Sequence, residues 1–515
     1  MLLEAIGIKF YIKDQLLLDI ERIQVNQDER IGLIGKNGTG KTTLLEVLAG
    51  KKQAEEGMIQ LNSTCELLPQ LKRSNTTKSG GEVTQEYIIE ALARNPEILL
   101  ADEPTTHLDT EHIEWLEKKL RAWQGAILLV SHDRAFLDAL CTSIWELENG
   151  CIKEYNGNYS DYLEQKELEL RSHAAAYEKY EQKKKQLEEA LILKEKKAAR
   201  ATKAPKKGIE SKKVKPYFAK KQKKLQAVAK SIETRLEKLE KVEKIKETSP
   251  IQMALPNEEA FTGRTILRVL NVAGGFVNRV LWKKASFEVR GGDKLAIVGA
   301  NGSGKTTLLK KIIENDVGIT LSPAVKYGYF SQTIDLLDSE KSILENVQIS
   351  SEQTETFIRI VLARLHFFRE DVYKQVKVLS GGERVKVALA KLFVSNINTL
   401  ILDEPTNFLD IEAVEALESL LMEYRGTIIF VSHDRRFIEK IATRILTIEN
   451  EELRVFEGTY QEFKNYEPRS EEEDNLLLLE TKITEVLSRL SIEPSAELEQ
   501  EFQRLLASKR KALEK

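Results

Sequence analysis

The sequence predicts an α/β fold in which two related domains are joined by an antiparallel pair of helices. Three observations support this prediction. Four short motifs occur twice in the same order, short apolar segments of strand type precede them, and a charged stretch with heptad spacing separates the two sets. A chain of 515 residues is also too long for one hydrophobic core.

An internal repeat organises the chain. The motifs are GKNGTGKT at 35–42 and GANGSGKT at 299–306, SGGE at 79–82 and 380–383, DEPT at 102–105 and 403–406, and SHDR at 131–134 and 432–435. The first motif recurs at a shorter interval than the other three, so the first copy is the shorter one between its first two motifs. We therefore expect a first domain at 1–160, with a reduced helical subdomain, and a second domain at 261–467.

The segment 161–260 predicts a helical linker. Apolar residues recur at intervals of seven on both sides of a stretch that contains Pro205, Gly208 and Pro216. This pattern predicts an antiparallel coiled-coil hairpin with an irregular tip. Residues 468–515 are expected to form a short helical C-terminal extension, divided in two by Pro494.

Charge is concentrated in this linker. The whole chain has a net charge of -3, whereas residues 194–224 contain 14 Lys or Arg and two Glu, a local charge of +12. A basic block in a mildly acidic protein favours one local contact with a polyanion such as RNA. The alternative is a solvated charged hairpin that binds nothing.

Composition excludes several classes of protein. No stretch approaches the roughly 18 apolar residues of a membrane helix, and the N-terminus lacks the pattern of a signal peptide. Cys65, Cys141 and Cys151 have neither zinc-site spacing nor a disulfide framework. We therefore expect a cytoplasmic protein without a membrane segment.

Each copy of the first motif follows a strand (30–34 and 294–298) and precedes a helix, which is the context of a P-loop NTPase. The glycines let backbone N–H groups surround phosphates at a helix N-terminus, the lysine supplies charge, and the threonine hydroxyl binds Mg²⁺. The expected ligands are ATP and Mg²⁺. The loop residues are Gly35, Asn37, Gly38, Gly40, Lys41, Thr42 and Thr43 in the first copy, and Gly299, Asn301, Gly302, Gly304, Lys305, Thr306 and Thr307 in the second.

Two carboxylates end a buried strand in each copy. Asp102 and Asp403 are expected to hold Mg²⁺, and Glu103 and Glu404 to act as general bases toward the attacking water. His132 and His433 follow strands at 126–130 and 427–431, where they could contact the γ-phosphate.

Four further residues are weaker candidates. Gln70 and Gln332 lie between the phosphate loop and the SGGE motif, where a Gln can bind Mg²⁺ and water; an ordinary loop residue is the alternative for Gln70. Tyr11 and Phe276 precede the two phosphate loops at nearly the same interval and could stack on adenine, or could belong to the core.

Together these motifs resemble the ABC ATPases across both predicted domains. The resemblance implies two ABC-type nucleotide-binding domains that face head to tail within one monomer, each site pairing one P-loop with the other domain's SGGE signature. Site one would join Lys41, Thr42, Gln70, Asp102, Glu103 and His132 to Ser380, Gly382 and Glu383. Site two would join Lys305, Thr306, Gln332, Asp403, Glu404 and His433 to Ser79, Gly81 and Glu82.

Tandem cassettes with a long helical linker resemble the ABC-F family, and DEPTNFLD at 403–410 is close to its pattern. Only eight residues separate Gln70 from Ser79, which leaves no room for the extra arm of some housekeeping members. The chain resembles the antibiotic-resistance members of the Vga type. This implies binding to the bacterial 70S ribosome at 23S rRNA near the peptidyl-transferase centre and at P-site tRNA.

The implied function is protection from lincosamides, streptogramin A and pleuromutilins. The alternatives are a housekeeping translation factor acting on stalled ribosomes, the ATPase subunit of an exporter, and a DNA-repair ATPase. At the linker tip, Tyr217 and Phe218 are expected either to stack on a splayed RNA base or to close the end of the hairpin.

Overall fold

The computed structural model describes residues 1–69, 80–106, 108–201, 211–239, 241, 263–276, 279–331 and 336–466, and parts of 479–513. Several expected residues lie outside this description: Gln70, Ser79, Gln332 and the tip residues 202–210, as well as the side chains of Glu82, Tyr217 and Phe218.

The first cassette is built around a six-stranded sheet. Its order is β5 (Cys65–Leu68), β6 (Ile98–Asp102), β7 (Ala126–Val130), β3 (Arg30–Ile34), β8 (Ser143–Glu148) and β9 (Cys151–Asn156). All pairings are parallel except that of β9 with β8. Every residue of β6 and β7 is buried, as expected for parallel strands covered on both faces.

A smaller antiparallel sheet and four helices complete this cassette. The sheet order is β2 (Gln15–Val25), β1 (Leu3–Ile12) and β4 (Glu56–Leu61). The helices are α1 (Lys41–Leu48), α2 (Gly80–Ala93), α3 (Thr110–Ala122) and α4 (Arg134–Leu140).

The second cassette repeats this plan. Its large sheet has the order β14 (Tyr327–Phe330), β15 (Thr399–Asp403), β16 (Thr427–Val431), β12 (Lys294–Gly299), β17 (Arg444–Glu449) and β18 (Glu452–Glu457), and its small sheet β11 (Arg279–Arg290), β10 (Thr265–Phe276) and β13 (Ile319–Leu321). The helices that match the first cassette are α8 (Lys305–Glu314), α11 (Gly381–Val394), α12 (Ile411–Glu423) and α13 (Arg435–Ile441), and the short α14 (Tyr460–Lys464) follows β18.

The difference in length between the two copies corresponds to a helical layer. Between β14 and α11 the second cassette contains α9 (Ile343–Gln348), α10 (Glu355–Arg364) and the 3₁₀ helices η1 (Arg369–Tyr373) and η2 (Val376–Val378). Residues of α9, α10 and η1 pack with α11 in the largest hydrophobic core cluster. In the first cassette only residues 69–79 separate β5 from α2.

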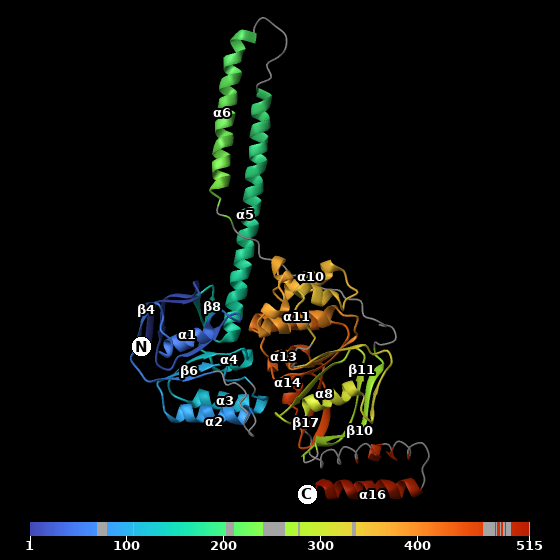
Figure 1. The fold of residues 1–515 in the computed structure, drawn as a ribbon. Coiled ribbons are helices and arrows are strands. Elements are labelled where there is room, and N and C mark those ends of the chain that lie inside the picture. The colour runs from blue at the N-terminus through green and yellow to red at the C-terminus, as the bar shows by residue number, and fades with distance from the viewer. Residues whose placement is uncertain are drawn as a thin grey trace.

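The linker projects away from both cassettes as two antiparallel helices, α5 (Tyr159–Ala201) and α6 (Ser211–Glu237), which lie side by side (Figure 1). At 1.5 Å per residue, α5 is about 65 Å long. Ala198 on α5 and Ala229 on α6 are buried. We call this helix pair the arm.

The structure corrects one expectation about the arm. Pro216 lies inside α6 and not in an irregular tip, because the helix begins five residues earlier at Ser211. Pro216 is the sixth residue of α6, just beyond the four N–H groups that have no partner within a helix, so it removes one backbone hydrogen bond, the one to the carbonyl of residue 212. Near the C-terminus, α16 (Ala496–Leu513) begins two residues after Pro494.

None of the helices that the structure describes is long and apolar enough to span a lipid bilayer.

Candidate nucleotide sites

The two P-loops have the same strained geometry, which glycine makes possible. Gly35 has φ 150° and Gly40 has φ 104°, and their counterparts Gly299 and Gly304 have φ 157° and 105°. A Cβ added to Gly35 would lie 2.5 Å from the carbonyl oxygen of Leu147. The loop therefore excludes side chains where a phosphate must approach the backbone.

The loop lysines point back into this cradle. Lys41 Nζ donates to the carbonyl oxygens of Gly35 at 2.7 Å and Lys36 at 2.9 Å, and Lys305 Nζ makes the equivalent contacts in the second copy. Burial lowers the pKa of both lysines, while nearby carboxylates such as Glu103 and Glu404 oppose that shift. Each loop thus holds a buried cation that fits a phosphate group.

Each site also contains a hydroxyl and a carboxylate suited to a hard cation. Thr306 Oγ1 donates to Asp403 Oδ1 at 3.2 Å, and Thr42 hydrogen-bonds Asp102 in the same way. Both aspartates are buried, which raises their pKa. Oxygen ligands of this kind fit Mg²⁺.

The expected general bases lie directly after these aspartates. The Glu103 and Glu404 side chains are almost fully buried, and burial raises their pKa to about 8 and about 7. Both residues have left-handed backbone, with φ 52° and 53°. A raised pKa matches the requirement for a base that works near neutral pH.

A histidine lies against each base. His132 Nε2 is 3.1 Å from Glu103 Oε1, and His433 Nε2 is 3.2 Å from Glu404 Oε1. Burial lowers the pKa of the two imidazoles to about 4 and about 3, so they are neutral at physiological pH. The hydrogen bond that His132 makes to the Glu103 carboxylate comes from its backbone, whose N–H donates to Glu103 Oε2 at 3.3 Å.

Contacts between the cassettes close both sites. The backbone N–H of Asn37 donates to Asp410 Oδ2 at 3.0 Å, and that of Asn301 donates to Asp109 Oδ2 at 2.8 Å. Asn37 Nδ2 also donates to the carbonyl oxygen of Phe408. Each P-loop is therefore bonded to the segment that follows DEPT in the opposite cassette.

Asp109 and Asp410 were not among the residues expected from the sequence. A signal was present, because the repeat extends beyond DEPT to a Leu-Asp pair at 108–109 and 409–410. Read alone, each aspartate is an ordinary helix N-cap. The contact with the other cassette appears only once the two halves are placed together.

The second signature faces the first P-loop. A Cβ added to Gly382 would lie 3.2 Å from Asn37 Nδ2. Ser380 and Glu383 form a capping box at the start of α11, in which Glu383 Oε2 accepts the Ser380 N–H at 2.8 Å. This gives Glu383 a structural partner in addition to its expected place near nucleotide. In the first signature, Gly81 and Glu82 lie in the first turn of α2.

The adenine candidates lie on the small sheets. Tyr11 is in β1 and is 36% exposed, and Phe276 ends β10 and is 68% exposed. The alternative that these aromatics belong to the core is therefore wrong. Stacking on adenine stays a prediction.

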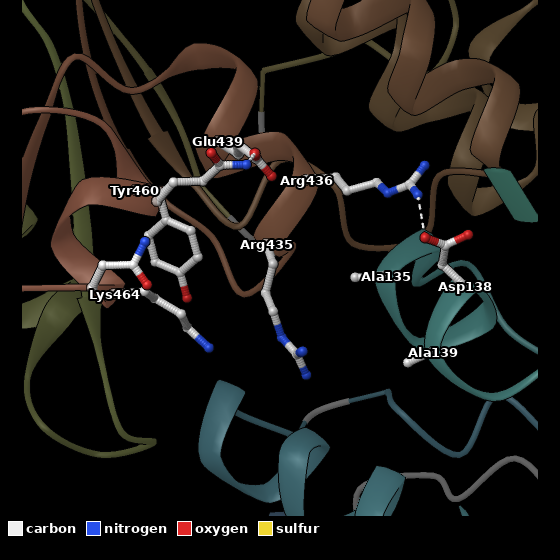
Figure 2. A pocket seen from close by; sticks show the side chains of 10 residues that line it. Ala135, Asp138, Ala139, Arg435, Arg436, Glu439, Tyr460 and Lys464 are labelled. Carbon is white, nitrogen blue, oxygen red and sulfur yellow. Dashed lines mark hydrogen bonds and ion pairs between the residues drawn. The ribbon is translucent and has the colours of Figure 1, made fainter.

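A pseudo-symmetric set of ion pairs joins the cassettes away from the P-loops. Arg134 forms a buried bidentate pair with Glu418, and Arg435 Nη2 lies 3.0 Å from Glu117. Beside them is a cavity of about 510 Å³, where Arg436 of α13 contacts Asp138 of α4 at 3.0 Å (Figure 2). Tyr460, Arg435 and Lys464 also line it, so residues of both halves meet here.

Comparison with known proteins decides the family. A family model described as "ABC transporter" matches residues 18–74 and 282–407, and a second with the same description matches 145–253. The chain is 33% identical to the ribosome protection protein VmlR of Bacillus subtilis over 520 residues, 94% of this chain and 92% of that protein. It is 35% identical to the erythromycin resistance ATP-binding protein MsrA of Staphylococcus epidermidis, over 84% of this chain and 94% of that protein.

The chain belongs to the ABC-F family of ATP-binding cassette proteins. Its fold also resembles the solved structure of an RNase-L inhibitor, with a TM-score of 0.60 and 19% identity over 89% of this chain and 92% of that one. As an ABC-F protein it is an ATP hydrolase. Cassettes of this family generally bind ATP with Mg²⁺.

Proposed function

We propose that this ABC-F ATPase binds the bacterial 70S ribosome and protects it from antibiotics bound near the peptidyl-transferase centre. The observation that carries the proposal is the combination of two cassettes closed on each other with an arm that projects from them. Similar relatives are named for ribosome protection and for erythromycin resistance. The basic window at 194–224 supplies charge for rRNA phosphates.

ATP would be held at two composite sites with the membership expected from the motifs. Thr42 with Asp102, and Thr306 with Asp403, would hold Mg²⁺, which neutralises charge on the phosphates. Glu103 and Glu404 would accept a proton from the attacking water, while His132 and His433 keep each carboxylate oriented. Turnover would then separate the cassettes and release the ribosome.

Ribosome binding is tested by co-sedimentation with 70S ribosomes in ATP, using a Glu103→Gln, Glu404→Gln variant to slow turnover. We expect affinity to fall steeply with salt, because cations displaced from rRNA are released into solution. Deleting residues 194–224 should weaken binding and flatten this dependence. The control replaces three exposed lysines of the second cassette, Lys283, Lys341 and Lys377, by Gln. Equal losses in both variants would mean that the arm is not the main contact.

Drug protection is tested separately, by susceptibility of cells expressing the chain to lincosamide, streptogramin A, pleuromutilin and macrolide. Replacing residues 206–219 by a Gly-Ser segment should abolish protection while basal ATPase is retained. Single Tyr217→Ala and Phe218→Ala changes distinguish stacking on an RNA base from closure of the hairpin. Only a role in closing the hairpin predicts a lower melting temperature. Ribosome binding without protection against any of these drugs would favour the housekeeping function.

A further inference from the structure

The internal repeat allows the base of the arm to be compared with a helix that carries no arm. In both cassettes a helix starts just after the last strand of the large sheet, at Tyr159 in α5 and at Tyr460 in α14, which are equivalent positions of the repeat. The second helix ends after five residues, whereas the first continues for 43. Residues that differ at the two helix bases are therefore candidates for a function specific to the arm.

The packing at these two bases differs in chemistry. In the second cassette Phe456 of β18 packs on Phe463 of α14, with ring centroids 5.8 Å apart, and Thr447 occupies the neighbouring position on β17. In the first cassette the corresponding residues are Tyr155, Tyr162 and Glu146. The contact at the helix base is thus apolar beneath the short α14 and polar beneath α5, which continues into the arm.

These polar groups converge on one carboxylate. Glu146 accepts hydrogen bonds from Tyr162 OH at 2.9 Å and Tyr155 OH at 3.2 Å, and it forms an ion pair with Lys166 of α5. Burial raises the pKa of both tyrosines, so their hydroxyls stay protonated donors. Tyr155 OH lies equally 3.2 Å from Glu169 Oε2 of α5, and Glu169 pairs with Lys153 of β9 at 2.7 Å.

The same carboxylate lies next to the first P-loop. Glu146 is paired with Ile34 in the parallel register of β8 and β3, and Ile34 immediately precedes Gly35. The following residue, Leu147, has the carbonyl oxygen that a side chain at Gly35 would strike. One strand thus contacts the P-loop with its backbone and the arm with its side chain.

We propose that Glu146, Tyr155, Tyr162 and Lys166 form a positioning anchor that fixes the direction of the arm relative to the P-loop sheet of the first cassette. Hydrogen bonds are directional, whereas apolar side chains tolerate rotation and sliding. A long helix magnifies any angular freedom at its base. At the usual helical rise, Glu189 lies about 40 Å beyond Tyr162, so a tilt of about 10° moves it by about 7 Å.

The test replaces three residues of the anchor by their counterparts in the second cassette, as Glu146→Thr, Tyr155→Phe and Tyr162→Phe in the full-length chain. Spin labels are attached to Gln27→Cys, in the exposed turn before β3, and Glu189→Cys, exposed on α5, after the three natural cysteines are replaced by Ser or Ala. Double electron–electron resonance spectroscopy then measures the distribution of distances between the two labels. We expect the distribution to broaden, by about 7 Å for each 10° of angular freedom that the base of the arm gains.

Two further variants make the result specific. Tyr162→Phe alone removes one hydroxyl that donates to the Glu146 carboxylate, so it should broaden the distribution partly and lower the melting temperature less than the triple variant does. Tyr177→Phe makes the same change farther along α5, beyond the anchor, and should leave the distribution unchanged. If the triple variant retained the native distribution, the anchor proposal would be overturned. No ribosome is needed, so a failure here is distinguishable from failure of the proposed function.

Discussion

Glu103 and Glu404 occupy a backbone conformation that a glutamate seldom adopts. Their φ values of 52° and 53° lie in the left-handed region, where a residue with a Cβ is destabilised by about 1–2 kcal/mol. The peptide N–H groups of the two residues donate to the carbonyl oxygens of Val130 and Val431 at 2.9 and 3.0 Å. The same strain at equivalent positions of both halves directs each carboxyl toward its histidine, as an active-site role requires.

Replacing both bases by Gln should nearly abolish ATP hydrolysis. The amide keeps the size of the side chain but cannot accept the proton of water, and loss of a general base costs about 10²- to 10⁴-fold in rate. Steady-state ATPase of the purified double variant is the measurement. The control is Glu314→Gln, an exposed carboxylate at the end of α8. Turnover within a factor of two of the unmodified protein would contradict the assignment.

For single residues, the sequence predicts which side chains form the nucleotide sites better than it predicts their backbone conformation. The P-loop lysines, the buried aspartates and the glutamates that follow them lie together as their motifs indicate, whereas the approach of each histidine to its glutamate was not predicted. The left-handed backbone of Glu103 was not predicted, because its N–H hydrogen-bonds Val130 of another strand only after the strands pack. The capping role of Glu383 is local, and Ser380-Gly-Gly-Glu383 has the spacing of a capping box, so the sequence did contain a signal for it. Gln70, Gln332 and the adenine contacts of Tyr11 and Phe276 stay predictions.

Among the elements, α3 and α12 have N-caps that serve two partners at once. Asp410 Oδ1 accepts the N–H of Ala413 within its own helix, while Oδ2 accepts that of Asn37 in the other cassette, each at 3.0 Å. Asp109 divides its two oxygens between His112 and Asn301 in the same manner. The start of each helix is thereby coupled to closure of the opposite P-loop.

An Asp109→Ala, Asp410→Ala double variant should lose stability and turnover together. Each lost N-cap costs about 1 kcal/mol. Each lost bond to the opposite P-loop is a hydrogen bond to a charged group, which contributes about 1.5–3 kcal/mol, so turnover should fall at least about tenfold. Thr354→Ala removes the N-cap of α10, which lies outside the nucleotide sites, and should lower stability without changing turnover. Equal effects of the two changes on ATPase would argue against a role in closure.

The sequence also predicts the elements unevenly. The strand before the first P-loop ends at Ile34 as expected, and the strand before the second ends at Gly299, one residue later than expected, since short apolar runs beside glycine-rich loops have few alternatives. The start of α6 was misjudged, because Pro216 is tolerated within the helix near its start. The short connection between β5 and α2 agrees with the unequal spacing of the repeated motifs, and the reduced helical subdomain of the first cassette stays a prediction. The contacts at the base of the arm could not be predicted from the sequence, since Glu146 and Tyr162 meet only when α5 packs on β8.

At the scale of the whole molecule, a buried ion pair between Arg134 and Glu418 bridges the two halves. Arg134 is 1% exposed and pairs with Glu418, also 1% exposed, so this pair is removed from solvent by contact between the cassettes. Asp434 and Lys440 contribute further contacts at 3.3 and 2.8 Å. Such a pair stabilises the closed arrangement only while both members are present.

Arg134→Met should open the molecule, because it leaves the buried Glu418 without its main partner, at a cost of about 3–5 kcal/mol. Small-angle scattering in ATP, with Glu103 and Glu404 also replaced by Gln, should give a larger radius of gyration. Adding Glu418→Met removes the second charge and should restore part of the compactness. Arg121→Met, at an exposed arginine of the same cassette, is the matched control. Indistinguishable scattering from the single variant and its control would refute a closing role.

The ion pairs between the cassettes follow the internal repeat, so they also determine how each half would associate if the two halves were produced separately. Arg435 and Glu418 both belong to the second half, and they are the counterparts of Arg134 and Glu117 in the first. A fragment comprising the second cassette alone therefore carries both complementary charges on one face. Two such fragments can associate about a twofold axis, each arginine meeting the other's glutamate, as in an isologous homodimer. Separately produced halves would therefore form homodimers in competition with the pairing of one half with the other, a competition that the covalent link between the cassettes prevents.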